Sequence, residues 1–147
     1  MVDIEDLKDR FLNMEFDTKG FKLDADRACK IALATGNDRP CYSDPKDPNL
    51  QATHALLASL ASGRRLPIDF PKLGGMVVDG GKAVTLIAPV PVNQELTGRT
   101  HLHDIYDKTG RSGRMIFLVA RMEIYGPDET KLAITDSRMV IREKPTS

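Results

Sequence analysis

The chain has 147 residues, the usual size of one compact domain, and 41% of them are hydrophobic, which is enough to bury a core. Lys and Arg together number 21, as do Asp and Glu, so the formal net charge is zero and excludes a general electrostatic attraction to nucleic acid or to anionic membranes. Aromatic residues make up only 5%, which disfavours a surface for stacking nucleic-acid bases.

An amphipathic helix is predicted at the N-terminus, over residues 3–14. Its apolar side chains recur at helical spacing with charged residues between them: Ile4, Leu7, Phe11 and Met14. The stretch is acidic and lacks an apolar core, so it does not resemble a signal peptide. An extended piece, EFDTKGFKL, follows, and its Gly20 suggests a bend. We therefore expect one domain spanning residues 1–147, in which residues 1–20 form the N-terminal helix and the segment that leads from it into the rest of the domain.

A second helix is predicted over residues 25–35. Asp24 is placed to cap its N-terminus, and Gly36 is placed to follow its last turn in the left-handed conformation. The predicted buried stripe consists mostly of small side chains, which permits close packing on a neighbour: Ala25, Ala28, Cys29, Ala32 and Leu33.

The proline-rich segment RPCYSDPKDPNLQ is predicted to be a loop, and HALLASLAS after it a short helix that Gly63 ends. That helix is apolar on nearly every side, so it should be enclosed rather than packed by one face. Glycines and prolines make residues 64–81 read as loop, apart from a short strand at 76–78.

From residue 82 the apolar pattern changes to a period of two, which predicts strands at 82–90, 97–108, 115–125 and 131–143. The linker GPDET is typical of a hairpin connection. The third strand has one apolar face, and Arg121 and Glu123 lie on the other. Helices followed by an antiparallel meander predict an α+β hot-dog fold, in which the sheet wraps around HALLASLAS. Such a sheet has exposed edges, so pairing as a dimer is expected.

The loop GNDRPCYSD at 36–44, with the two residues before it, resembles a motif of the MaoC-like hydratases and dehydratases. That family, which includes the R-specific enoyl-CoA hydratases, carries the pattern A-T-G-D-x-N-P-x-H before its central helix. Ala34, Thr35, Gly36 and Pro40 match it. The strands from residue 103 onward are similar to the last strands of the N-terminal, non-catalytic half-domains in two-part members.

The departures from this motif fall on the residues that the resemblance marks as catalytic. The family's Asp position holds Asn37, its His position holds Tyr42, and its Asn position holds Arg39. An amide cannot accept a proton, and a phenol, with a reference pKa of about 10, is a poor base at neutral pH. Asp38 is one residue away and His54 begins the central helix; each is a candidate substitute, and a cap role for His54 is the favoured alternative.

Two further segments, KTGRSGR and HLHD, are candidates for a functional role. The basic loop KTGRSGR is either a mobile hairpin or a contact for the phosphates of coenzyme A through charge-assisted hydrogen bonds, with the candidates Lys108, Arg111, Ser112, Gly113 and Arg114. In HLHD, His101 and His103 share a strand face, but catalytic zinc usually takes three protein ligands, so solvated histidines are favoured and no metal is expected.

The resemblance implies a subunit of an enoyl-CoA hydratase or 3-hydroxyacyl-CoA dehydratase, a lyase, that shapes the acyl pocket while a partner chain supplies the catalytic Asp and His. A non-enzymatic acyl-CoA binding protein and a hot-dog thioesterase remain the alternatives. No cofactor is expected, only acyl-CoA as substrate or ligand. The expected partner is a second hot-dog chain, either identical to this one or different from it. Neither nucleic acid nor a membrane is expected as a partner. Two cysteines without a CxxC motif favour a cytoplasmic protein. The resemblance implies a role in fatty acid or steroid metabolism.

Overall fold

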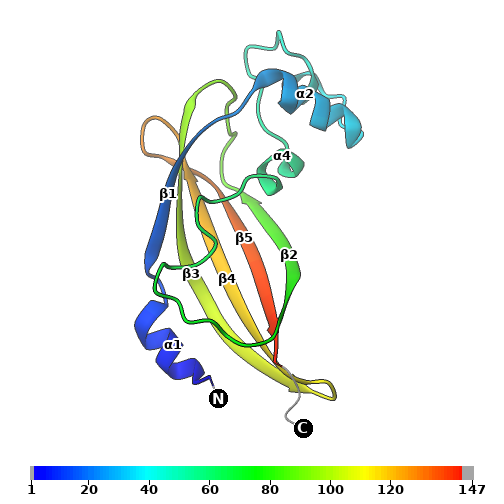
Figure 1. Ribbon diagram of the computed structural model, residues 1–147. Helices are drawn as coiled ribbons and strands as arrows, with labels where there is room; N and C mark the ends of the chain where they lie inside the picture. The colour runs from blue at the N-terminus through cyan, green and yellow to red at the C-terminus, as the bar shows by residue number, and fades with distance from the viewer. Residues whose placement is uncertain (1, 144–147) are drawn as a thin grey trace.

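The structure, a computed structural model, describes residues 2–143. Four helices and one five-stranded sheet form a single body (Figure 1). In chain order the elements are α1 (Ile4–Phe11), β1 (Glu15–Lys22), α2 (Ala25–Ala34), α3 (Pro40–Ser43), α4 (His54–Ala58), β2 (Met76–Leu86), β3 (Glu95–Gly110), β4 (Gly113–Tyr125) and β5 (Lys131–Arg142). Within residues 2–143, no helix has the length and apolar character that a membrane crossing requires.

The sheet is antiparallel throughout, with the strand order β1-β3-β4-β5-β2. The predicted meander holds only for β3, β4 and β5, because β2 leaves its sequence neighbour β3 and pairs with the far side of β5. β2 also joins two stretches that sequence reasoning separated. Gly80 and Gly81 form a bulge within it, where Gly81 has a φ of 96° and a Cβ on Gly80 would lie 2.8 Å from Val140 Cγ2.

Local sequence signals at α2 are confirmed. The Asp24 side chain accepts a hydrogen bond from Arg27 N at 2.9 Å, and Gly36 has a φ of 79°. Two expectations nearby were wrong. Leu33 is 58% exposed rather than part of the buried stripe, because the face that packs ends with Ala32. Gly20 causes no bend, since it pairs with Thr97 inside β1.

The predicted central helix is much shorter than HALLASLAS. α4 ends at Ala58, although its Leu56 and Leu57 are buried as expected. Residues 59–75 then cross the sheet without helix or strand before β2 begins, and Figure 1 shows this segment running over the same face that α4 covers. We call this face the inner face. The hot-dog arrangement is therefore present, but the helix α4 covers only one end of the inner face, and residues 59–75 cross the rest of it.

Two groups of buried side chains cover the inner face. The α4-side core joins α2, α4 and the nearby strand ends, with Leu57 and Ile124 among its fully buried members. The α1-side core joins α1, the lower part of the 59–75 segment and the opposite strand ends, with Leu7 and Ile105 among its members. One curved sheet thus carries two cores along its length.

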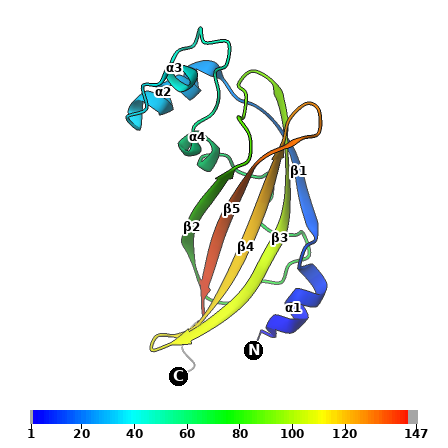
Figure 2. The ribbon, with the colours of Figure 1, turned by 180° about the vertical axis from the view of Figure 1, so that it is seen from behind.

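The outer face of the sheet is polar, and no helix of the described chain covers it (Figure 2). Arg121 donates two hydrogen bonds to Asp136, at 2.8 and 3.0 Å, and Tyr125 Oη donates to Glu123 at 2.6 Å. The alternation predicted for β4, with Arg121 and Glu123 opposite its apolar residues, is confirmed.

Candidate functional site

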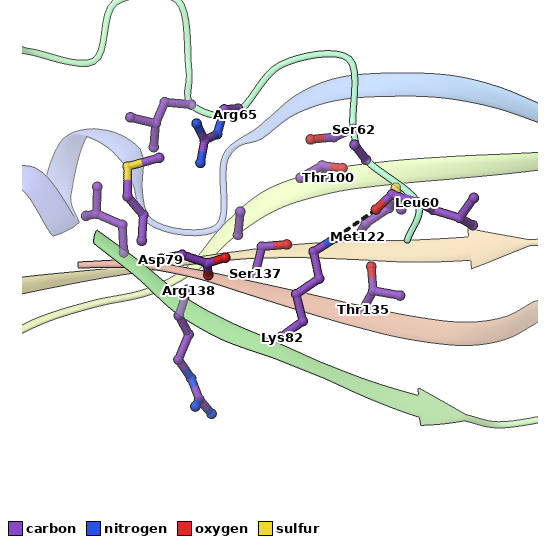
Figure 3. Close-up of a pocket in the computed structure, with 15 residues that line it drawn as sticks. Leu60, Ser62, Arg65, Asp79, Lys82, Thr100, Met122, Thr135, Ser137 and Arg138 are labelled. Carbon is purple, nitrogen blue, oxygen red and sulfur yellow. Dashed lines mark hydrogen bonds between the residues drawn. The ribbon is translucent and has the colours of Figure 1, made fainter. Parts of the chain in front are cut away.

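A pocket of about 240 Å³ lies against the inner face, between the two cores (Figure 3). Met122 bounds it on one side and belongs to the α4-side core, whereas Leu118 bounds it on the other and belongs to the α1-side core. Because α4 ends at Ala58, no helix continues over this part of the sheet. The early end of the helix is what leaves the space open.

Strand register builds the floor of the pocket. Across β4 and β5, Ala120 is opposite Ser137, and these small side chains leave room that larger ones would fill. The rows on either side carry bulkier groups, namely Thr100, Met122 and Thr135 toward α4, and Leu118 and Met139 toward α1. The floor therefore combines an apolar surface with three hydroxyl groups.

The first part of the crossing segment, residues 60–66, forms the roof. Three hydrogen bonds hold it to both edge strands of the sheet: Lys19 Nζ donates to Ala61 O at 3.1 Å, Gly63 N donates to Asp17 Oδ2 at 2.8 Å, and Lys82 Nζ donates to Leu60 O at 2.8 Å. The first two come from β1 and the third comes from β2. The roof is thus tied across the sheet rather than stabilised by helical hydrogen bonds.

Charged groups occur only at the rim of this pocket. Burial lowers the pKa of Lys82, and the nearby Asp79 carboxylate opposes that shift. The Asp79 side chain accepts a hydrogen bond from Gly81 N at 2.8 Å, and Figure 3 shows the Arg138 side chain pointing away from the space. The residues that line the pocket include no His, Glu, Cys or Tyr. The pocket therefore lacks an Asp–His pair, and its titratable groups include Asp79 and Lys82 at the rim.

The motif loop at 36–44 lies elsewhere. It follows α2 and contains α3, at the end of the molecule beyond α4 (Figure 1). Asn37 Oδ1 accepts a hydrogen bond from Arg39 N at 3.3 Å, and the Arg39 guanidinium lies 5.8 Å from the centre of the Tyr42 ring. Neither Asn37 nor Tyr42 lines the pocket. Within one chain, the family's catalytic positions and the pocket are separate.

The two candidate substitutes are also outside the pocket. Asp38 is exposed, and its backbone carbonyl accepts a hydrogen bond from Ser43 Oγ at 2.9 Å. His54 is exposed at the start of α4, where Thr53 is the residue that caps the helix by accepting from Leu56 N at 3.2 Å. The structure does not bring Asp38 or His54 to the pocket lining.

The basic loop KTGRSGR forms the tight hairpin between β3 and β4, at the opposite end of the sheet from α2 (Figure 1). Arg114 is engaged within the chain, because its Nε donates to Asp107 at 2.8 Å and its Nη1 lies 3.4 Å from Glu143. Lys108 lies above the rings of Tyr106 and Phe117. Arg111 and Ser112 are exposed at the tip, followed by Gly113 with a φ of 104°.

His101 and His103 are neighbours on β3, with ring centres 5.6 Å apart in an edge-to-face arrangement. Burial lowers the pKa of His101, which favours its neutral form. In the part of the chain that the structure describes, no three His, Cys, Asp or Glu side chains converge as metal ligands.

Sequence reasoning missed the residues that build the pocket, notably Thr100, Ala120 and Ser137. A signal did exist for Thr100, because this hydroxyl residue stands at an inward-facing position of a strand whose other inward positions are apolar. The sequence pattern places Lys82 only at the start of a predicted strand. Its role at the rim depends on pairing between β2 and β5, which are distant in the sequence.

Solved structures with the same fold include several dehydratases. The MaoC-like dehydratase from Rhodospirillum rubrum aligns with a TM-score of 0.59 and 14% identity, over 95% of this chain and 98% of that one. The C-terminally truncated HadBC complex from Mycobacterium tuberculosis, a 3R-hydroxyacyl-ACP dehydratase, aligns with a TM-score of 0.64 and 17% identity, over 95% of this chain and 98% of that one. The ChsH1-ChsH2 complex from the same organism aligns with a TM-score of 0.61 and 16% identity, over 98% of this chain and 90% of that one.

No family model matches the sequence, and no curated protein matches it either. At such low identities, the structural similarity establishes the fold and leaves the reaction open. The predicted hot-dog fold, as found in MaoC-like dehydratases, is confirmed.

Proposed function

We propose that this chain is the pocket-forming subunit of an enoyl-CoA hydratase or 3-hydroxyacyl-CoA dehydratase, in which a different hot-dog chain supplies the catalytic Asp and His. The observation that carries the proposal is a pocket of about 240 Å³, without an Asp–His pair, in the fold of MaoC-like dehydratases. The motif positions support it, because Asn37 and Tyr42 stand where the resembling family has its proton-transferring residues.

The chemistry of the reaction explains the division of labour. Hydration adds water across the double bond of the enoyl thioester, so one group must take a proton from the water and a proton must be delivered to the carbon next to the carbonyl. An amide such as Asn37 can orient a water molecule but cannot accept its proton. The apolar floor around Leu118 and Met122 is suited instead to hold the acyl group.

Coenzyme A would be bound partly through the hairpin of residues 108–114. Arg111 is exposed at its tip, whereas Arg114 is held by Asp107 and Glu143. We assign the main phosphate contact to Arg111, with Lys108, Ser112 and Gly113 contributing to the shape and polarity of the loop. A guanidinium forms strong, charge-assisted hydrogen bonds to phosphate oxygens.

Edge strand β2 is the surface on which we place the catalytic partner chain. Met76, Val77 and Val78 at its start are exposed by 57%, 55% and 40%. The other edge, β1, is rich in charged residues and holds the roof through Lys19 and Asp17. An apolar strand edge favours pairing with another sheet, whereas charges protect an edge from it. The HadBC complex and the ChsH1-ChsH2 complex, which have the same fold, support a partner of this kind.

A lysine on the β2 edge should disrupt this association. Val77→Lys is expected to abolish co-purification with the catalytic chain, since a charge would have to be buried at the seam between the sheets. Light scattering after size exclusion measures the result. Thr18→Lys on the β1 edge is the matched control and should leave the complex intact. If Val77→Lys retains the complex while Thr18→Lys loses it, β1 is the pairing edge and the assignment is wrong.

The function itself is tested by measuring hydration of a panel of enoyl-CoA thioesters, by the loss of their conjugated ultraviolet absorbance. The chain alone should be inactive. Co-expression with a hot-dog chain from a neighbouring gene that carries the intact G-D-x-N-P-x-H motif should raise the rate by about 10²–10⁴, the usual contribution of general acid–base catalysis. Robust hydration by the purified chain alone would contradict the proposal.

A second candidate is an acyl-CoA binding protein that takes part in no catalysis. The pocket supports this binding protein equally well, because it offers space for a ligand and contains no Asp–His pair. This candidate predicts acyl-CoA binding with no co-purifying hot-dog chain and with no activity in any mixture.

A further inference from the structure

One hydroxyl of the pocket lacks a hydrogen-bond partner. Thr100 is only 1% exposed, and its Oγ1 is the one buried side-chain oxygen or nitrogen without a partner among the described residues. A buried hydroxyl that is left unpaired is unfavourable, and most buried polar groups in folded proteins are satisfied. A residue at this place would be expected to be apolar unless its hydroxyl has something to bind.

The position of Thr100 relates that hydroxyl to the pocket. Thr100 lies opposite Met122, which lies opposite Thr135, so the row forms one side of the floor. Figure 3 shows Thr100 on the strand that passes beneath the roof, with Thr135 and Lys82 farther along the same space. The polar groups are therefore distributed along the floor and rim, while Leu118, Ala120 and Met122 provide the apolar surface between them.

The dimensions limit what can occupy the space. A buried apolar cavity of about 150 Å³ accommodates a benzene molecule. The pocket here, about 240 Å³, accommodates a somewhat larger branched or ring-shaped group. A purely apolar group of that size would be complementary to the wall of β4 but would leave Thr100 unpaired.

We propose that the pocket selects acyl groups whose distal, bulky part carries an oxygen substituent, and that Thr100 donates a hydrogen bond to this oxygen. The inference rests on the proposed function, namely that the chain binds the acyl group of a thioester. It adds the chemical class: a branched or cyclic acyl chain with a ketone or hydroxyl remote from the thioester. Sites built to hydrogen-bond a substrate oxygen discriminate against analogues that lack it, because the protein group is then left unpaired.

The test uses the 147-residue chain and two ligands of matched size, a cyclohexyl-bearing acyl-CoA and its ring-ketone analogue. Calorimetric titration should show about five- to tenfold tighter binding of the ketone, the range that one net hydrogen bond supplies. Thr100→Val should remove this preference and leave the affinity for the unsubstituted analogue unchanged. Thr100→Ser, which retains a hydroxyl, should preserve it, as should Thr97→Val on the outer face of the same strand.

Thermal unfolding of the free protein adds a readout that does not depend on ligands. Replacing an unpaired buried hydroxyl by a methyl of the same shape should leave the Tm of Thr100→Val equal to or above that of wild type. A clear fall in Tm would mean that the hydroxyl is already satisfied, and it would overturn the inference.

The outcomes separate the inference from the proposed function. Equal binding of the two analogues by the wild-type chain overturns the inference alone, since the chain would still bind acyl-CoA. Absence of binding for both analogues overturns the inference and the acyl-CoA function together. Because the wild-type comparison decides the first case, a failure of Thr100→Val to fold does not remove the test.

Discussion

Leu57→Ala is expected to lower the free energy of unfolding by about 2–5 kcal/mol, the usual range for removing a buried leucine side chain. Leu57 is fully buried in α4, which packs between α2 and the sheet. The short helix places only two leucines in the core, Leu56 and Leu57, so each contributes a large share of its attachment. The corresponding fall in Tm is roughly 5–15 °C for a chain of this size, and circular dichroism with urea titration measures both quantities.

Leu33→Ala provides the matched control for this prediction. It makes the same change in α2, but Leu33 is 58% exposed. Its effect should stay within about 0.5 kcal/mol, as for most surface substitutions. Equal losses for the two variants would show that α4 is not the buried helix of the fold.

Ala120→Leu is expected to fill the centre of the pocket and to weaken binding of bulky acyl-CoA thioesters by at least about tenfold, because the added side chain and the ligand would compete for the same volume. Stability should change little, since the side chain enters open space rather than a filled core, where overpacking typically costs about 1–3 kcal/mol. Calorimetric titration with a branched and a short straight-chain acyl-CoA measures the effect, and the branched ligand should lose more.

Ala83→Leu is the control for the pocket-filling variant. Ala83 lies on β2 of the same sheet, is exposed and does not line the pocket. The variant should bind both ligands as wild type does. If Ala120→Leu also leaves the affinity for the branched ligand unchanged, the acyl group is bound at another place.

Local features of the fold could be read from the sequence because their physical causes are local. The cap at Asp24 and the left-handed Gly36 depend on residues within one helical turn. The faces of β4 follow from an alternation that needs no knowledge of partners. The hot-dog arrangement could be predicted because, apart from β1, all helices precede the strands along the chain.

Non-local features could not be read in this way. The glycine pair at 80–81 looks like a break, and only the pairing of β2 with β5 makes it a bulge. α4 ends at Ala58 although HALLASLAS continues in helical composition, because a helix this short depends on tertiary contacts more than on propensity. The pocket needs Thr100, Ala120 and Ser137 from three strands, brought together by register alone.

A helix over the pocket would have satisfied its peptide groups within itself. The roof at 60–66 instead depends on Lys19, Asp17 and Lys82 for its ties, and all three belong to the two outermost strands. Displacing the roof therefore breaks a few side-chain contacts and leaves the hydrogen bonds between strands intact. Such a covering belongs to the least stable part of a fold, where local opening requires far less free energy than global unfolding. We therefore expect the roof to open locally for ligands of different size while the five strands of the sheet stay paired.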